Sequence, residues 1–286
     1  MATGLLEAIQ KQAIWREMIA KYDRQFIWGD NVPNWDDSID QDKPSVTFFK
    51  SKNQNKNRGC VLVIPGGKYL YKSTNEAVNV ALRINEAGID AAVLDYRVVP
   101  YSREVILNDV KRAIRYLRFN ASDFGFNADK IAVMGFSAGG NLATLCALCG
   151  DEGDINSSDP IERVSSRPNA VVLCYAAVNI IDKYEQREDF SLISYFDVVV
   201  DRDFKLFPPT FIWHSMRDRM INFKTSTELG AVLAQMGVPV EMHFFPYGEH
   251  AQGLADTQKG ELEQGDNKLA LCWSDLCMRW LDHYGF

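Results

Sequence analysis

The sequence lacks any long hydrophobic run. None of its apolar stretches approaches the roughly 18 residues that a transmembrane helix needs. Residues 1–22 also lack the uninterrupted apolar core of a signal peptide, because Glu7 and Glu17 fall within them. We therefore expect a cytoplasmic protein without a membrane partner.

The sequence also has fewer basic than acidic residues. The 286 residues contain 31 Lys and Arg against 38 Asp and Glu, which gives a net charge of −7. Binding to nucleic acid relies on clustered Lys and Arg, so we expect no nucleic-acid partner. The one dense basic stretch, from Lys111 to Arg118, has helical spacing and is interpreted as a solvated helix face.

The sequence also lacks the cysteine and histidine clusters that hold metal ions. Cys146 and Cys149 form a C-x-x-C, but it lies inside a helical pattern, and a zinc site needs a second pair of ligands. We interpret the six cysteines as buried free thiols. No internal repeat or low-complexity linker divides the chain.

What the sequence does contain is a regular alternation of strand-like and helix-like segments. The strand-like runs are almost continuously apolar, as in a parallel sheet that is buried on both faces. Right-handed crossovers place the connecting helices on both faces of such a sheet. We therefore predict one α/β domain over residues 1–286 with a mostly parallel central sheet. The expected strands are 44–50, 60–65, 89–96, 130–136, 170–176, 209–214 and 240–245, and the expected helices are 5–21, 76–87, 104–119, 139–148, 225–236 and 268–284.

Two segments fall outside this alternation. Residues 1–45 form a helical and then irregular N-terminal extension. Residues 177–207 lack clear periodicity and fall between two predicted strands, so we expect a cap-like insert there.

Two acidic residues are assigned structural roles. Ser73 and Glu76 have the spacing of a capping box at the start of the helix over 76–87. Asp109 lies near the start of another predicted helix, where a carboxylate favours the helix dipole. We expect a capping or surface role for Asp109.

The strongest chemical signal is a G-x-S-x-G motif that runs from Gly135 to Gly139. It lies between a predicted strand and a predicted helix, which is the context of a nucleophile on a strained turn. Ser137 then points above the carboxyl end of its strand, where sites of α/β proteins form. The alternative is an ordinary strand-to-helix turn.

A serine nucleophile needs a base, and the base needs an acid that fixes its tautomer. His250 lies in a loop directly after the last predicted strand and is favoured as the base, with His214 as the alternative. Asp218 follows the preceding strand and is favoured as the acid in the order Ser, Asp, His. Its alternative role is a helix cap or a surface pair with a neighbouring arginine. The other candidate acids lie in the irregular insert: Asp182, Asp189, Asp197, Asp201 and Asp203.

An ester hydrolase also needs donors for the oxyanion that develops on the carbonyl. One is expected to be the backbone N–H of Ala138, and the others should come from the glycine-rich turn over 65–69. The alternative is a tight turn that packs without binding anything. A phosphate-binding loop is excluded, because neither of its glycine patterns is present.

The ordered set of motifs resembles the α/β-hydrolase esterases related to hormone-sensitive lipase, and in particular the bacterial acetyl esterase or acetylxylan esterase-like "sugar hydrolase" group. The resemblance runs from about residue 45 to the C-terminus. The segments that carry it are VLVIPGGKYLY (61–71), VLDYRVVP (93–100), LNDVKRAIRYLR (107–118), DKIAVMGFSAGGNLAT (129–144), HSMRDRMIN (214–222) and YGEHAQGL (247–254).

The resemblance implies an α/β-hydrolase fold, a triad of Ser137, Asp218 and His250, and no metal or organic cofactor. It also implies that the oxyanion donors are Gly67 and Lys68 together with Ala138. Two departures stand out, since Pro65 replaces a frequent histidine and Lys68 stands where a third glycine is usual.

The predicted function is therefore a serine carboxylesterase that removes short acyl groups, in particular acetyl, from small-molecule esters such as acetylated sugars. The alternatives are a peptidase on the same fold and a non-catalytic binding protein. Tyr69 and Phe136 flank the motifs and are candidates either for substrate binding or for core packing. The oligomeric state is left open, with a homo-oligomer as one outcome.

Overall fold

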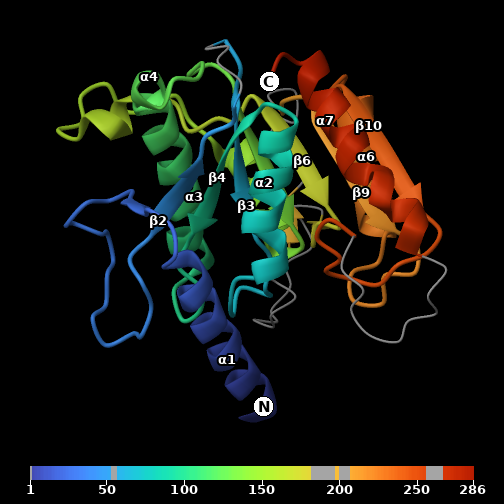
Figure 1. Cartoon of the computed structure of the whole chain (residues 1–286), viewed down its shortest axis with the longest axis horizontal. Coiled ribbons are helices and arrows are strands. Elements are labelled where there is room, and N and C mark those ends of the chain that lie inside the picture. The colour runs from blue at the N-terminus through green and yellow to red at the C-terminus, as the bar shows by residue number, and fades with distance from the viewer. Residues whose placement is uncertain (1, 53–56, 182–196, 200–206, 256–266) are drawn as a thin grey trace.

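The computed structural model describes residues 2–52, 57–181, 197–199, 207–255 and 267–286. Its centre is an eight-stranded sheet in the order β1-β2-β4-β3-β5-β6-β9-β10 (Figure 1). From β4 to β10 all neighbours are parallel, whereas β1 and β2 are antiparallel to their neighbours. The predicted α/β fold with a mostly parallel sheet is confirmed. The strands are β1 Gln25–Phe26, β2 Ser45–Phe49, β3 Cys60–Ile64, β4 Asp90–Asp95, β5 Ile131–Phe136, β6 Ala170–Cys174, β9 Thr210–Ser215 and β10 Val240–Phe245.

Helices cover both faces of the sheet, as the apolar strands require. The central strand β5 is buried along its whole length, and its side chains alternate between two hydrophobic cores. Val133 faces the core shared with α3, α5 and α6, and Met134 faces the core shared with α1, α2 and α7. In Figure 1, α2 and α7 lie in front of the sheet. The helices are α1 Ala2–Ile19, α2 Val78–Glu86, α3 Arg103–Phe119, α4 Ala121–Phe124, α5 Ala138–Cys149, α6 Lys224–Gln235 and α7 Trp273–His283, with the short 3₁₀ turns η1 Thr74–Glu76, η2 Pro160–Arg163 and η5 Asn267–Cys272.

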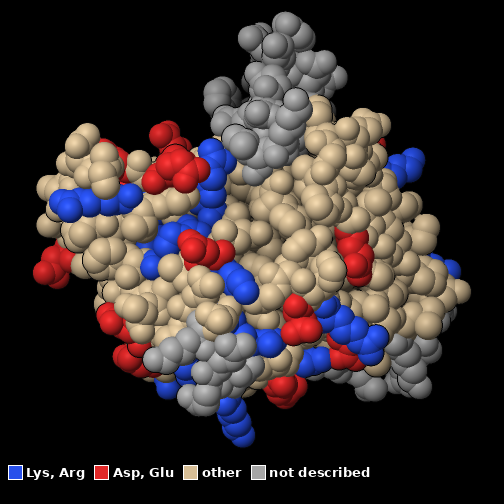
Figure 2. Space-filling model, turned by 90° about the horizontal axis from the view of Figure 1, so that it is seen from above, with Lys and Arg blue, Asp and Glu red and all other residues tan. Residues whose placement is uncertain are grey.

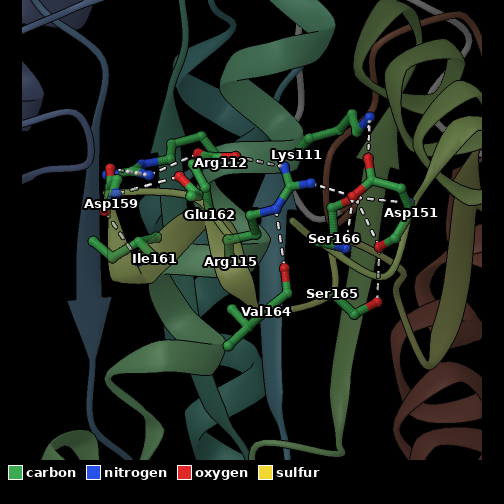
Figure 3. A network of polar contacts seen from close by, with 12 residues as sticks. Lys111, Arg112, Arg115, Asp151, Asp159, Ile161, Glu162, Val164, Ser165 and Ser166 are labelled. Carbon is green, nitrogen blue, oxygen red and sulfur yellow. Dashed lines mark hydrogen bonds and ion pairs between the residues drawn. The ribbon is translucent and has the colours of Figure 1, made fainter. Parts of the chain in front are cut away.

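The basic side chains of α3 contradict the expectation of a solvated face. Arg112 and Arg115 are buried and bind acidic residues of the segment that follows α5 (Figure 3). Arg112 Nη1 lies 2.7 Å from Glu162 Oε1, and Lys111 Nζ lies 2.5 Å from Asp151 Oδ2. The spacing was helical as expected, but the partners come from about forty residues further along the chain, beyond the reach of a local pattern.

The two structural assignments of acidic residues are also wrong. Ser73 makes no side-chain cap, and its backbone N–H donates to the carbonyl of Gly66. The carboxylate of Glu76 binds the N–H of Gly66 and the hydroxyl of Tyr175. Asp109 is completely buried and forms a bidentate pair with Arg97, through Nε at 2.9 Å and Nη2 at 2.7 Å. This pair ties α3 to the residues that follow β4, because a buried carboxylate needs a charged, hydrogen-bonding partner.

All six cysteines are free thiols. Four of them are buried as expected, but Cys149 is half-buried and Cys272 is exposed. Burial raises the pKa of the Cys146 thiol to about 12, which keeps it unreactive.

The expected insert over 177–207 lies mostly outside the described residues. The described part of it contributes two short parallel strands, β7 Asn179–Ile181 and β8 Asp197–Val199. Within the described chain, no helix combines the length and the hydrophobicity that a membrane span requires. At the end of the molecule that Figure 2 shows, acidic and basic side chains are interspersed.

Candidate active site

Ser137 occupies a strained turn between β5 and α5. Its φ of 51° and ψ of −116° are rare for a residue with a side chain. The turn depends on Gly139, since a Cβ atom there would lie 2.0 Å from the carbonyl oxygen of Ile64 on β3. The structure therefore places Ser137 on the sharp strand-to-helix turn that the motif predicts.

The residues Ser137, His250 and Asp218 form one hydrogen-bonded chain. Ser137 Oγ lies 2.7 Å from His250 Nε2, and His250 Nδ1 lies 2.6 Å from Asp218 Oδ2. The three side chains leave the loops after β5, β10 and β9, and these loops meet at the carboxyl edge of the sheet. With Nδ1–H donated to the carboxylate, the unprotonated Nε2 can accept the serine proton.

Three further groups besides His250 hold the carboxylate of Asp218 in place. Its Oδ1 accepts the backbone N–H groups of Met220 and Ile221, each at 2.9 Å, and His214 Nε2 lies 3.1 Å from Oδ2. Burial alone raises the pKa of Asp218, but the hydrogen bonds from His214 and His250 outweigh it and hold the pKa far below its usual range. The carboxylate is thus ionised at neutral pH, and the alternative roles as a helix cap or a surface pair do not apply.

His214 is a partner of the carboxylate and not of the serine. It is completely buried, and its Nε2 lies 3.1 Å from the carbonyl oxygen of Ile221 as well as near Asp218. Because a carbonyl only accepts, Nε2 carries the proton, and Nδ1 lies 2.8 Å from the hydroxyl of Ser226. The alternative assignment of His214 as the base is therefore wrong.

The glycine-rich turn after β3 lies directly beside Ser137. A Cβ atom at Gly66 would come within 2.9 Å of Ser137 Cβ. The turn closes on Gly67, whose carbonyl accepts the N–H of Leu70 at 2.9 Å. Lys68 has a positive φ of 59° and an exposed side chain, so this departure from the usual glycine is accommodated without crowding the turn.

The family follows from comparison with known proteins. The BD-FAE family profile matches residues 47–199 of the chain. The chain belongs to the BD-FAE family of α/β-hydrolases. This confirms the resemblance inferred from the motifs.

Relatives of this BD-FAE member are esterases and xylan-active enzymes. A solved structure of an acetyl ester-xyloside bifunctional hydrolase from Caldicellulosiruptor lactoaceticus is 33% identical, with a TM-score of 0.78, over 92% of this chain and 97% of that one. Endo-1,4-beta-xylanase B of Butyrivibrio fibrisolvens is 28% identical over 82% of this chain and 38% of its own length. An acetylxylan esterase of Xylanibacter ruminicola is 24% identical over 75% of this chain and 45% of its own. The chain thus spans less than half of these two curated relatives, and the expected class, carboxylic ester hydrolase, agrees with the esterases among them.

The two aromatic residues considered for substrate binding lie inside the BD-FAE domain. Tyr69 and Phe136 are both completely buried. Tyr69 donates its hydroxyl to Asn141 Oδ1 at 2.7 Å, and Phe136 packs against Tyr175 and Trp273. In this structure both therefore pack and support the site, and neither presents a surface to a substrate.

Two residues at the site were missed by the sequence reasoning. Glu76 and Tyr175 are buried beside the turn and the histidine loop, and they bond to each other. Tyr175 directly follows β6, so its place at the carboxyl edge was predictable from the parallel sheet, although no motif marks it. Among the residues described, no group of three or more His, Cys, Asp or Glu is arranged to hold a metal ion.

Proposed function

We propose that this BD-FAE member is a serine carboxylesterase in which Ser137 is the nucleophile, His250 the base and Asp218 the acid. The observation that carries the proposal is the continuous chain from Ser137 Oγ at 2.7 Å to His250 and at 2.6 Å on to Asp218. A non-catalytic binding protein has no need of such a chain on a strained turn. The esterases among the relatives support the same reaction class.

The geometry supports an acyl-enzyme mechanism. Ser137 Oγ attacks the ester carbonyl while His250 Nε2 takes the serine proton, and the imidazolium is stabilised by the ionised Asp218. The tetrahedral intermediate collapses, the C–O bond of the alcohol breaks, and the alcohol leaves with the proton from His250. Water then repeats the sequence on the acyl-enzyme and releases the carboxylic acid.

We assign the oxyanion donors to the backbone N–H groups of Ala138, Gly67 and Lys68. Ala138 opens α5 directly after the nucleophile, so its N–H belongs to the unpaired first turn of that helix. The turn that carries Gly67 and Lys68 lies against Ser137, as the close approach of Gly66 indicates. Donors fixed in this way stabilise negative charge that appears only during the reaction.

We further propose that the acyl group is short, in particular acetyl, and that the alcohol is a carbohydrate. Two relatives act by name on acetylated xylan or on acetyl esters and xylosides. The chain itself supports a small acyl group through the rings packed behind Ser137, which fill the interior next to the nucleophile.

A serine-reactive phosphonate tests the assignment directly. Wild-type protein should be labelled at Ser137 alone, and Ser137→Ala should be folded, unlabelled and inactive on p-nitrophenyl acetate and acetylated xylo-oligosaccharides. Ser215 is the buried last residue of β9, and its hydroxyl donates to the backbone carbonyl of Tyr247. It offers a matched control, because Ser215→Ala should keep its labelling. Labelling at another residue, or full activity of Ser137→Ala, would contradict the proposal.

A further inference from the structure

A buried carboxylate connects the glycine-rich turn over 65–69, which we call the oxyanion turn, to the rest of the site. Glu76 lies on the 3₁₀ turn η1 and is 1% exposed. Its Oε2 accepts the backbone N–H of Gly66 at 2.8 Å, and its Oε1 accepts the hydroxyl of Tyr175 at 2.8 Å. Glu76 therefore joins the loop after β3 to the loop after β6.

Tyr175 continues this connection to the loop that carries the base. Its hydroxyl oxygen accepts the backbone N–H of Gly253 at 2.8 Å, three residues after His250. Its ring packs edge-on against the imidazole of His250, with the ring centres 5.1 Å apart. Tyr175 holds this place with a positive φ of 37°, a strained value for a side chain of this size.

We propose that Glu76 and Tyr175 form a positioning bridge that holds the oxyanion turn and the His250 loop in register on Ser137. The inference rests on the proposed esterase function and adds two residues to its machinery. Neither residue touches the reacting atoms. The bridge acts through Gly66 on one side and through Gly253 and the imidazole ring on the other.

The donors and acceptors of the bridge allow one arrangement. Because the N–H of Gly253 donates to the phenol oxygen, the phenol proton is directed to Glu76 Oε1. Both carboxylate oxygens then accept, which suits an ionised glutamate. Burial and the charge of Glu76 raise the pKa of Tyr175 well above its usual value, so the phenol stays protonated and keeps donating.

The bridge matters because catalysis is sensitive to small displacements. Losing one oxyanion donor lowers kcat by roughly 100- to 1000-fold, and a misplacement of about 1 Å by roughly 100-fold. Gly66 directly precedes the proposed donor Gly67, so the bond to Glu76 fixes the Pro65–Gly66 peptide, which adjoins the peptide that carries the N–H of Gly67. A looser turn should therefore reduce the stabilisation of the transition state more than it reduces substrate binding.

The test compares Glu76→Gln, Glu76→Ala, Tyr175→Phe and the Glu76→Gln/Tyr175→Phe double variant. Asp109→Asn is the matched control, since Asp109 is an equally buried carboxylate that bonds to Arg97 in the segment after β4. For each protein we would measure kcat and KM on p-nitrophenyl acetate, the fraction of active sites titrated by phosphonate, the Tm, and the affinity for a boronic acid that forms a tetrahedral adduct on the serine.

We expect Tyr175→Phe and Glu76→Gln to lower kcat per titrated site by roughly 10- to 100-fold, with KM changed by less than about twofold. Boronic acid affinity should fall in parallel. Glu76→Ala should be worse than Glu76→Gln, because glutamine keeps one acceptor for Gly66. The double variant should be about as slow as the slower single variant. Asp109→Asn should lose Tm but keep its kcat per site.

The measurements separate a failure of the positioning bridge from a failure of the proposed esterase function. Bridge variants with wild-type kcat per site, or losses shared by Asp109→Asn in proportion to Tm, would overturn the positioning role while leaving the esterase intact. A folded wild-type protein that neither hydrolyses esters nor reacts with phosphonate would overturn the proposed function and the bridge with it.

Discussion

At the scale of single residues, the members of the chain from Ser137 to Asp218 depend on one another. We expect Ser137→Ala and His250→Ala each to lower kcat by roughly 10⁶-fold, and Asp218→Asn by roughly 10⁴-fold. The Ser137→Ala/His250→Ala variant should be no slower than either single variant, because each change already removes the activated nucleophile. Single-turnover kinetics on p-nitrophenyl acetate measure the series. An unchanged rate in Asp218→Asn would move the acid elsewhere, with the 177–207 insert as the first place to search.

His214 offers a second prediction, because it shares the carboxylate of Asp218 with His250. In His214→Leu the carboxylate keeps His250 and two backbone donors but loses one hydrogen bond, so its pKa should rise from its lowered value. We expect a loss in kcat/KM of roughly tenfold and a loss of about 2–3 kcal/mol in the free energy of unfolding, since Ser226 and the Ile221 carbonyl lose their buried partner.

His250→Ala is the reference for that measurement. Its activity should be far lower than that of His214→Leu, whereas its stability should be closer to wild type because His250 lies nearer the surface. A His214→Leu variant as inactive as His250→Ala, at unchanged stability, would contradict the supporting role of His214.

The positions of Ser137, Asp218 and His250 could be predicted because each lies in a loop that follows a parallel strand. Their residue types, in this order along the chain, are those that a serine hydrolase uses. The same reasoning failed for Glu76, which has the spacing of a capping box with Ser73. A capping box is a local pattern, but the donors that bind Glu76 come from Gly66 and Tyr175, in the loops of two other strands. Spacing within one helix contains no information on which loops the sheet brings beside it.

At the scale of elements, α3 is fastened to the segment after α5 by ion pairs that a solvated face would not make (Figure 3). Asp151 is the centre of this contact, and Lys111 and Arg115 both bind it. Burial opposes ionisation of Asp151, but the bonds from Lys111 and Gly153 and the charge of Arg115 lower its pKa to about 2.

The lowered pKa of Asp151 predicts a pH-dependent stability. A carboxylate with a lowered pKa in the folded state stabilises the protein above its unfolded pKa of 3.8, and the stabilisation is lost as the pH falls towards about 2. Asp151 is 45% exposed, so solvent screening limits the effect to about 1 kcal/mol. Urea unfolding should thus show Asp151→Asn less stable than wild type at pH 7 and equal to it near pH 2.

Glu152→Gln is the matched control for this experiment. Glu152 lies beside Asp151 and pairs with Arg167 at 2.8 Å, but it is 77% exposed. Its replacement should leave stability within experimental error at every pH. A stability difference for Asp151→Asn that does not change with pH would show that the ion pairs do not cause it.

At the scale of the whole molecule, the parallel sheet assembles the site. The loops after β3, β5, β6, β9 and β10 leave one edge of the sheet and supply the glycine-rich turn, Ser137, Tyr175, Asp218 and His250 in turn. This convergence follows from the strand direction and was predictable from the alternation of strands and helices. The surroundings of Ser137 on the interior side were not predictable, because aromatic residues near the motifs fit both a pocket wall and a core.

The aromatic residues on the interior side of Ser137 pack as a core, and this packing bears on the length of the acyl group that fits there. Phe136, Tyr175, Trp213 and Trp273 form one group of buried rings, with neighbouring centres 4.9–6.1 Å apart. All four are at most 1% exposed. A long acyl chain directed into this part of the protein would have to displace these packed rings.

We therefore expect acetyl and propionyl esters to be preferred, with kcat/KM falling steeply beyond about butyryl. A methylene that finds an apolar pocket gains about 0.8 kcal/mol, so each should raise kcat/KM roughly fourfold where space exists. A methylene forced against packed rings costs about 1–3 kcal/mol instead and moves the carbonyl out of attack geometry. The measurement is kcat/KM for p-nitrophenyl esters of two to ten carbons. A maximum at eight carbons or more would show that the acyl chain leaves along another path, and the short-chain assignment would then be wrong.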